Sequence, residues 1–270
     1  MLIHRVIDYL DDARAYVSKR ALHKRENDEL WALHFHWDEY KAELCSQLLS
    51  QTFVFSPIRD DSLPSHQVVR SLNCVDQLVQ KALALVLVDV LPRSPLCFSY
   101  LEHGGVTSAL EYVSQYSASR FGFKTDVVNY TGSIGHLCLL DKLSAYVDES
   151  VLWLVYQALN LHRTGLPENG PLSHVLGNFY LHDLDVVFEG RTQTQHYCRY
   201  LDDVLVLTST RGALRMASRT IKHHFKLLEL NTATTKPWAG GMPTLYRLQT
   251  FLGQPVWATL LSERVNDLLK

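Results

Sequence analysis

Two adjacent carboxylates, Asp202 and Asp203, lie between two short runs of aromatic, β-branched and other apolar residues, 196–201 and 204–207. These runs predict a β-hairpin, although its centre lacks the Asn-Gly or Asp-Gly pair that a tight turn prefers. Two solvated turn acids would explain the pair. Alternatively, the strands hold both carboxylates around a divalent cation, because burying such charges without a partner costs several kcal/mol. The hairpin alone leaves both interpretations open.

A cation site needs a further ligand and a substrate pocket, and upstream segments supply candidates for both. Asp126 lies near the end of a predicted strand, 121–128, where it could instead cap a neighbouring helix. A turn-rich segment, 165–173, leads into a predicted helix whose first turn accommodates Pro171, since its missing N–H is not needed there. The strand with Asp126, the turn that leads into a helix and the Asp202-Asp203 hairpin could thus together form one cation and substrate site.

The order and the residues of the three segments resemble the palm of a reverse transcriptase. Residues 124–130, Lys-Thr-Asp-Val-Val-Asn-Tyr, are similar to its first carboxylate motif, and residues 200–203 match its Tyr-x-Asp-Asp signature. Residues 165–185 resemble the motif that supports template and nucleotide. The resemblance extends from about Phe53 to Gly253 and is greatest to bacterial reverse transcriptases akin to group II intron enzymes, in particular the unassigned, defence-associated lineages.

The resemblance implies a nucleotidyltransferase that uses two divalent metal ions. Asp126 and Asp202 would bridge two Mg²⁺ ions about 4 Å apart, and Asp203 would be a secondary metal ligand. The carbonyl of Val127 would be a backbone ligand. Magnesium suits such all-oxygen ligation, with Mn²⁺ as a substitute.

The resemblance also implies contacts to the incoming nucleotide and the primer. Tyr130 would pack against the sugar and exclude a 2′-hydroxyl, so deoxynucleotides (dNTPs) are the expected substrate. The other expected nucleotide contacts are Arg70, Pro167, Asn169, Gly170 and Lys236, and the expected primer grip is Phe251, Leu252 and Gly253. Two departures concern these residues: Glu168-Asn169 stands where the family usually has Gln-Gly, and Thr234 stands where it usually has a lysine, for which Lys236 would substitute.

Helices and strands are mixed without strict βαβ alternation, which favours an α+β fold. The resemblance makes this fold a right-hand polymerase palm and fingers, with an antiparallel palm sheet flanked by helices and a short or absent thumb. The expected domains are an N-terminal helical extension (1–50), fingers (51–118), a palm (119–253) with a fingers insertion at about 135–163, and a short C-terminal tail (254–270) that replaces the thumb.

Apolar periodicity and turn residues predict the individual elements. Helices are expected within 1–50 and over 76–91, 104–117, 135–147, 149–163, 171–188 and 211–228, and a further strand over 51–59. The helix over 76–91 is apolar nearly all round and should be buried. Thr107 or Ser108 would cap the helix that Gly104-Gly105 opens.

Bulk properties limit the class of protein. The chain has 270 residues, of which 47% are hydrophobic, and a net charge of −2. It has no apolar run of membrane-spanning length and no signal-peptide core, so we expect a cytoplasmic protein without a membrane partner. Five scattered cysteines without a Cys-x-x-Cys pair argue against structural zinc and a disulfide framework.

The net charge also argues against strong non-specific nucleic-acid binding, because that affinity comes mainly from neutralising phosphates. The basic residues of a nucleic-acid enzyme with this charge would have to gather in one groove. Without a thumb, the grip on primer and template would come from a partner protein, a structured RNA or a homo-oligomer.

The resemblance implies an RNA-directed DNA polymerase with an RNA template or non-coding RNA, dNTPs and a DNA product, and a role in bacterial antiviral defence. One alternative is template-independent or protein-primed DNA synthesis by the same palm. Another is a catalytically idle palm that acts as an RNA-binding or scaffold module, although all three carboxylates are present.

Overall fold

The computed structural model describes residues 1–21, 28–62, 68–116, 119–162, 164–167, 170–232 and 236–239. The chain divides into two compact units, each considered by itself. The first unit comprises Met1–Pro92 and Ile134–Tyr180, and the second comprises Arg93–Ser133 and the chain from Leu181 onward. The chain therefore passes between the units more than once. None of the described helices is long and apolar enough to cross a membrane.

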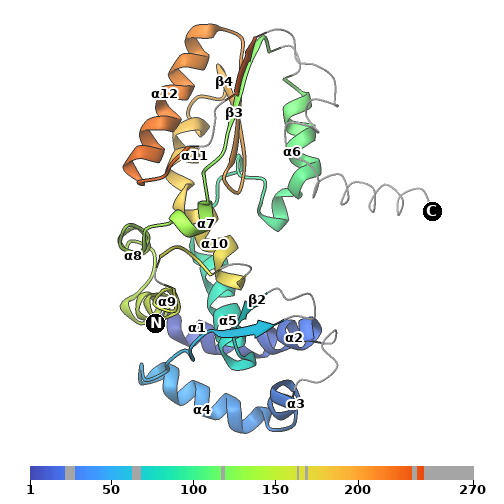
Figure 1. The fold of residues 1–270 in the computed structure, drawn as a ribbon, viewed down its shortest axis with the longest axis vertical. Coiled ribbons are helices and arrows are strands. Elements are labelled where there is room, and N and C mark those ends of the chain that lie inside the picture. The colour runs from blue at the N-terminus through green and yellow to red at the C-terminus, as the bar shows by residue number, and fades with distance from the viewer. Residues whose placement is uncertain are drawn as a thin grey trace, which may run out of the picture. The chain divides into compact units, whose positions relative to one another are not determined.

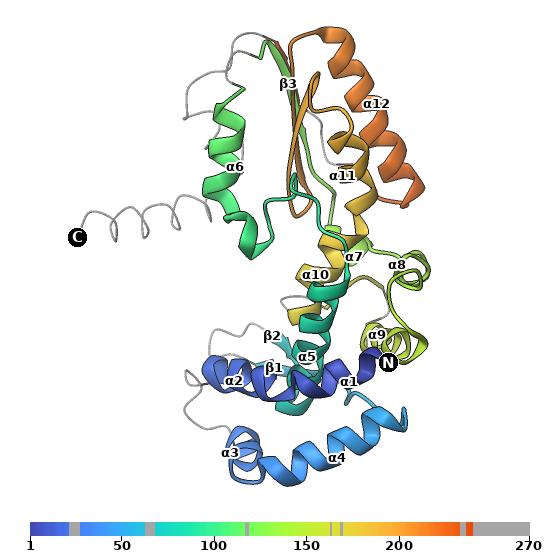
Figure 2. The ribbon, with the colours of Figure 1, turned by 180° about the vertical axis from the view of Figure 1, so that it is seen from behind.

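The first unit is mainly helical (Figures 1 and 2). Its elements are α1 (Leu2–Asp8), α2 (Leu10–Ala21), α3 (Asp28–Phe35), α4 (Trp37–Leu49), β1 (Arg59–Ser62), β2 (Val68–Ser71), α5 (Cys74–Val90), α8 (His136–Leu143), α9 (Glu149–Leu159) and α10 (Pro171–Tyr180). The helix α5 packs against α1, α2, α9 and α10. Because neighbours surround it, α5 buries residues on all sides, as its apolar sequence predicts.

Local signals fix the ends of α5. The side chain of Asn73 accepts a 2.7 Å hydrogen bond from the backbone N–H of Asp76 and so caps the helix. The helix ends at Val90, two residues before Pro92, whose ring cannot continue it. The predicted helix 76–91 is thereby confirmed.

The second unit is an antiparallel sheet between helices. Its elements are the 3₁₀ turn η1 (Leu101–His103), α6 (Gly105–Ser114), β3 (Phe121–Thr125), α7 (Tyr130–Ser133), α11 (His182–Glu189), β4 (Gln195–Tyr200), β5 (Asp203–Thr208), α12 (Arg211–Leu227) and β6 (Lys236–Ala239). The strand order is β4-β5-β3-β6, and every neighbouring pair is antiparallel. The predicted mixture of helices and strands and the predicted hairpin are confirmed.

Helices cover both faces of this sheet (Figures 1 and 2). On the α6 face, Cys198, Leu205 and Leu207 pack with Ala109 and Val113 of α6. The alternate residues of β5 face the side covered by α12, because successive side chains of a strand point to opposite faces. This two-sided cover explains why β5 is a continuous apolar run rather than an alternating one.

Two predicted elements and one predicted helix cap were wrong. Residues 52–58 form no strand; β1 starts only at Arg59 and pairs with β2. Phe53 and Phe55 are buried edge-to-face with ring centroids 5.0 Å apart, so packing rather than strand pairing explains these apolar residues. The helix that starts at Gly105 has Gly104 as its N-cap, with a φ of 76° and no capping side chain, instead of Thr107 or Ser108.

The third error is the single helix predicted over 171–188. It is interrupted at Leu181, between α10 and α11, where the chain passes from the first unit to the second. The carbonyl of Tyr180 accepts a 2.8 Å hydrogen bond from Lys142 Nζ. This contact comes from a residue distant in sequence, so local periodicity could not reveal the break.

Candidate active site

The carboxylates of the hairpin lie at its turn. Tyr200 pairs with Asp203 at the end of the β4–β5 ladder, which leaves Leu201 and Asp202 as the two turn residues. Leu201 has a φ of 52°, in the left-handed region that costs a residue with a side chain about 1–2 kcal/mol. A leucine in this conformation must therefore be held in place by its surroundings.

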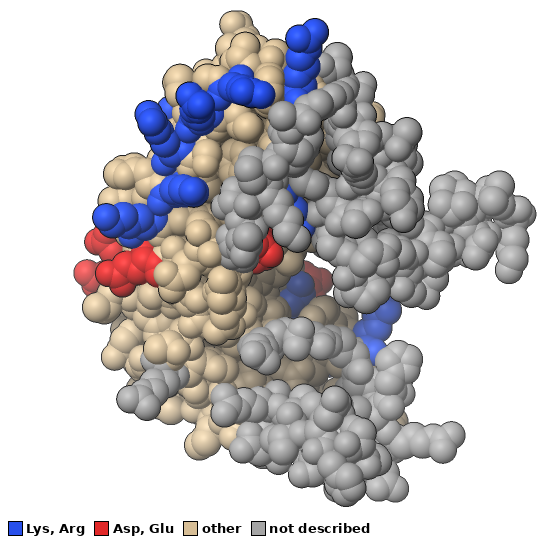
Figure 3. Space-filling view, turned by 45° about the horizontal axis from the view of Figure 1, so that its top comes forward, with Lys and Arg blue, Asp and Glu red and all other residues tan. Residues whose placement is uncertain are grey.

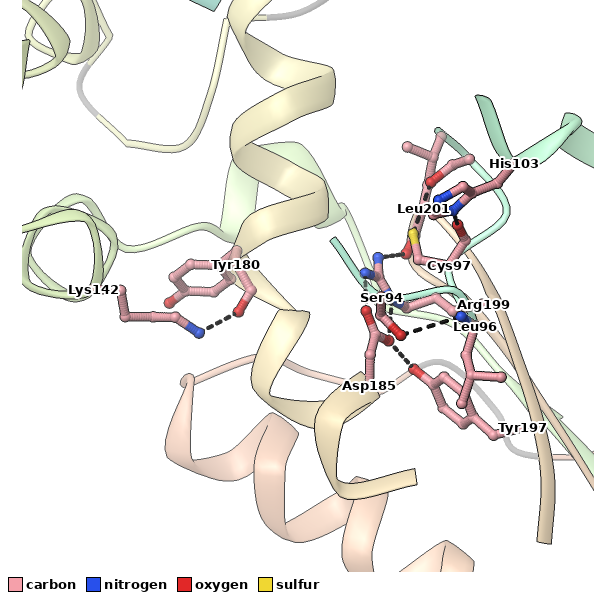
Figure 4. A network of polar contacts seen from close by, with 11 residues as sticks. Ser94, Leu96, Cys97, His103, Lys142, Tyr180, Asp185, Tyr197, Arg199 and Leu201 are labelled. Atoms are coloured by element: carbon pink, nitrogen blue, oxygen red, sulfur yellow. Dashed lines mark hydrogen bonds and ion pairs between the residues drawn. The ribbon is translucent and has the colours of Figure 1, made fainter. Parts of the chain in front are cut away.

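Arg199 supplies that support (Figure 4). Its Nη1 donates a 2.7 Å hydrogen bond to the carbonyl of Leu201. Its Nε donates a 2.7 Å bond to Asp185 Oδ1, and its Nη2 bonds to Asp185 Oδ2. The hydroxyl of Tyr197 donates a further 2.7 Å bond to Asp185 Oδ1. The side chains of Arg199 and Asp185 are completely buried. The guanidinium therefore links α11 to the turn through hydrogen bonds at both ends.

The Asp185 carboxylate favours the charged form of the buried Arg199 guanidinium. Burial by itself would lower the pKa of Arg199, but the adjacent Asp185 carboxylate holds that pKa well above its usual value. Burial raises the pKa of Tyr197 well above its usual range, and the Asp185 charge adds to that rise. Tyr197 therefore remains a hydrogen-bond donor to Asp185 at neutral pH.

The backbone of Arg199 is fixed as well. Its N–H donates to the carbonyl of Leu96 at 2.9 Å, and its carbonyl accepts from the N–H of Phe98 at 2.8 Å. His103 Nδ1 lies 2.7 Å from the carbonyl of Cys97, between these two residues (Figure 4). The segment 96–98 thus covers β4 at its outer edge, and both the main chain and the side chain of Arg199 are immobilised.

Asp126 reaches the same end of the sheet through strand pairing. Thr125, the last residue of β3, pairs with Val204, directly after Asp203. Asp126 therefore leaves β3 beside the turn that carries Asp202 and Asp203. The following backbone is held by a bridge from Val127 to Thr232 and by a 2.9 Å hydrogen bond from the Val128 N–H to the Asn231 carbonyl.

The pKa values of these acids report a crowded, half-buried group of charges. Burial raises the pKa of Asp202, the charges of Asp203 and Asp126 raise it further, and the Val127 backbone opposes them by hydrogen bonding. Burial also raises the pKa of Asp203, and the Asp126 charge adds to that rise. Both carboxylates are thus destabilised in their ionised form, a repulsion that a cation would relieve.

One cation is already present, and the sequence patterns did not indicate its role. Lys124 Nζ lies 2.6 Å from Asp203 Oδ1, and both side chains are partly buried. The ammonium lowers the pKa of Asp203 but does not fully offset its burial. Because side chains alternate along β3, Lys124 and Asp126, two residues apart, project from the same side. This spacing of two residues is the sequence feature that could have indicated that Lys124 lies close to the carboxylates.

The donor chemistry suits magnesium, since Asp126, Asp202 and Asp203 offer carboxylate oxygens and Val127 offers a carbonyl. Within the described residues, however, no group of three or more His, Cys, Asp or Glu side chains is arranged to hold a metal ion. Asp203 Oδ1 is instead occupied by Lys124. The two-ion magnesium site, with Mn²⁺ as substitute, therefore stays a prediction.

The predicted nucleotide contacts are distributed over both units. Tyr130 begins α7 and is 8% exposed, and burial raises its pKa well above the usual value, with Asp202 contributing. Pro167 and Gly170 belong to the first unit, where the Pro167 carbonyl accepts a hydrogen bond from Ser173 Oγ. Asn169, the side chains of Arg70 and Lys236, and the whole of Phe251, Leu252 and Gly253 lie outside the described residues.

Comparison with solved structures supports a reverse-transcriptase-like fold for this chain. The chain is similar to an apo telomerase from Candida tropicalis, with a TM-score of 0.51 and 9% identity over 77% of this chain and 50% of that one. A C-terminally truncated form of that telomerase gives a TM-score of 0.50 and 8% identity over 78% of this chain and 56% of the other.

A telomerase from Candida albicans in complex with a TWJ fragment of telomeric RNA overlaps less, with a TM-score of 0.44 and 11% identity over 59% of this chain and 33% of that one. The chain thus spans between a third and somewhat over half of the length of these structures. No protein-family model matches the sequence, and no curated protein matches it either. The likeness to the Candida tropicalis structures bears on the fold alone.

Proposed function

We propose that this chain is a nucleotidyltransferase that adds deoxynucleotides to a 3′ end, with RNA as its template. The observation that carries the proposal is the pairing of β3 with β5, which brings Asp126 beside Asp202 and Asp203 within a reverse-transcriptase-like fold. The acids are far apart in sequence and share one end of the sheet, as phosphoryl transfer with carboxylate-held metals requires.

In this reaction the residues of the chain hold and orient charge. Asp126, Asp202 and Asp203 would hold divalent metal through carboxylate oxygens, with the Val127 carbonyl beside them. The bound Mg²⁺ would activate the attacking 3′-hydroxyl and neutralise the triphosphate. Lys124 would keep Asp203 ionised and would exchange its contact when metal enters. Arg199 would keep the turn in place through Leu201.

Substrate choice would fall to Tyr130. Its ring is largely buried and electrostatically coupled to Asp202, so it lies near the proposed chemistry. A ring at this position would exclude the 2′-hydroxyl of a ribonucleotide. We therefore expect Tyr130→Phe to retain the preference for dNTPs and Tyr130→Ala to incorporate ribonucleotides more readily.

The biological setting extends the same proposal. The motif resemblance supports an RNA-directed enzyme of bacterial antiphage defence, acting with a non-coding RNA. A homo-oligomer or a partner protein would provide further grip on primer and template.

A second candidate is a non-catalytic, RNA-binding palm, and one observation favours it. Lys124 already neutralises Asp203, so the site carries an internal cation where a polymerase would take up metal. In that case the carboxylates serve the architecture of the turn, and their replacement leaves the biological phenotype unchanged.

Primer extension separates these candidates. The purified protein is incubated with Mg²⁺, the four dNTPs and an RNA template with a DNA primer, and then with single dNTPs without template. We expect template-dependent extension that Asp126→Asn and Asp202→Asn each abolish. Glu111→Gln, which neutralises an exposed acid on α6 in the same unit, serves as the matched control and should extend normally. Template-free homopolymer growth would indicate untemplated synthesis, and inactivity of the wild type would favour the RNA-binding palm.

A further inference from the structure

The helix α12 carries an unusual separation of charge. Its 17 residues, Arg211–Leu227, contain no acidic side chain. Five exposed Lys and Arg residues recur at intervals of three or four positions, namely Arg211, Arg215, Arg219, Lys222 and Lys226. At 100° per residue they fall within about 80° of the helix circumference. They form one stripe, here called the α12 stripe.

The stripe lies on the outside of the second unit. The other side of α12 buries Ala217, Ile221 and Phe225, and the helix packs on β3, β4 and β5. Figure 3 shows Lys and Arg side chains gathered in a row on the upper left, where Figure 1 places α12. Between Arg211 and Lys226 the stripe extends about 22 Å at 1.5 Å per residue.

The positive charges of the stripe are not internally neutralised. Among the described residues, none of the five pairs with a carboxylate. In a chain with a net charge of −2, such a concentration is a local feature rather than a consequence of composition.

We propose that the α12 stripe binds the phosphate backbone of a nucleic-acid strand. Regularly spaced cations on a rigid helix can contact successive phosphates, and counterion release makes such contacts favourable. Contacts to phosphates carry no sequence information, so binding through these five side chains is independent of sequence. This surface goes beyond the proposed chemistry and does not depend on it.

Two structural facts favour a nucleic acid over a membrane. The apolar face of α12 is already packed on the sheet, so the helix has no large apolar face to insert into lipid. After α12 the chain returns to Asn231, whose carbonyl accepts a hydrogen bond from the N–H of Val128, two residues beyond Asp126. The C-terminal end of the stripe thus leads toward the carboxylates, and a strand bound along it would be directed there.

The test measures binding without catalysis. Fluorescence anisotropy with a labelled single-stranded RNA is recorded in EDTA, without dNTPs, at several salt concentrations, for wild type, Arg215→Gln/Arg219→Gln and the control Lys19→Gln/Lys41→Gln in the first unit, which also removes the ion pair of Lys41 with Asp11. Both variants lose two positive charges, but only the first alters the stripe. We expect the stripe variant to bind about tenfold more weakly and to lose about 1.4 from the slope of log K against log[salt], whereas the control binds almost normally.

Several results would overturn the proposal. Equal weakening in both variants would show a general charge effect, and unchanged binding in the stripe variant would exclude these residues. Loss of binding to phosphatidylserine vesicles with unchanged RNA binding would assign the stripe to a membrane.

A parallel series with DNA of the same length shows whether the strand is RNA or DNA. Arg215→Lys/Arg219→Lys keeps the charge and should bind like wild type. If the glutamine variant does not fold, Lys222→Gln/Lys226→Gln, which removes two other charges of the stripe, carries the test with the same expected loss. Because binding is measured in EDTA and without dNTPs, a protein that is inactive as a polymerase still reports on the stripe, so failure of the polymerase proposal and failure of this one are distinguishable.

Discussion

Arg199 Nη1 donates a 2.7 Å hydrogen bond to the carbonyl of Leu201, the residue directly before Asp202. The same guanidinium is paired with Asp185 inside the protein. The position of the proposed catalytic turn therefore depends on a buried ion pair between β4 and α11. This relationship allows stability and positioning to be tested separately.

Arg199→Met should destabilise the protein by about 3–5 kcal/mol, because Asp185 remains as a buried charge without its partner. Arg199→Met/Asp185→Asn should recover much of that stability, since the amide is neutral and still accepts a hydrogen bond from Tyr197. Both variants should lose about 100-fold in kcat with little change in KM, because the Leu201 carbonyl is no longer fixed. Urea unfolding and primer extension give the two readouts.

The conservative Arg199→Lys is the control for charge. It retains the cation but not the planar fork, so we expect intermediate activity. A double variant with wild-type kcat would show that Arg199 contributes to folding alone and does not position the turn.

Removal of Lys124 should change the pH dependence of activity. The ammonium lowers the pKa of Asp203, so Lys124→Met raises that pKa further. Since metal binding requires ionised Asp203, the acidic limb of the pH–rate profile should move to higher pH. Extension rates measured from pH 5 to about pH 9 test this, with the exposed Lys19→Met as control. If the acidic limb does not move in Lys124→Met, ionisation of Asp203 does not limit the extension rate.

Asp202→Asn should make the metal-free protein more stable at neutral pH while it abolishes extension. The folded-state pKa of Asp202 is raised above its ordinary value, so its ionisation opposes folding. The stability contribution of this carboxyl is present below pH about 4 and is lost as the pH rises through its folded pKa. The gain of the variant should therefore appear at pH 7 and vanish near pH 3. Denaturant unfolding at both values, with Glu111→Gln as control, checks this sign.

Asp148 tests a structural cap in the first unit. Its carboxylate accepts hydrogen bonds from the Leu2 N–H at 2.6 Å, Ser150 Oγ at 2.6 Å and the Val151 N–H at 3.2 Å. Burial raises the pKa of Asp148, but these bonds outweigh burial and lower it. Asp148→Ala should cost about 1–2 kcal/mol at pH 7, and the difference from wild type should shrink as the pH falls below the ordinary aspartate pKa. Thermal unfolding measures it, and Asp12→Ala, an exposed first-turn acid of α2, should have little effect.

The sequence alone determined the elements whose signals are local. Continuous apolar character and Pro92 predicted α5, apolar runs around Asp202-Asp203 predicted the hairpin, and basic helical spacing predicted α12. These signals suffice because capping, strand alternation and helical period each act over a few residues. The motif order also anticipated that Asp126 would be associated with the hairpin.

Only the tertiary structure decided how charge is distributed around those acids. The contacts of Arg199 with Asp185 and of Lys124 with Asp203 join different elements, and the break at Leu181 falls where the chain changes units. Such contacts form only when packing closes long loops and buries the partners together, so no local pattern encodes them. Burial also gives them their strength, because a charge removed from water must be paired by a neighbour that the fold itself supplies.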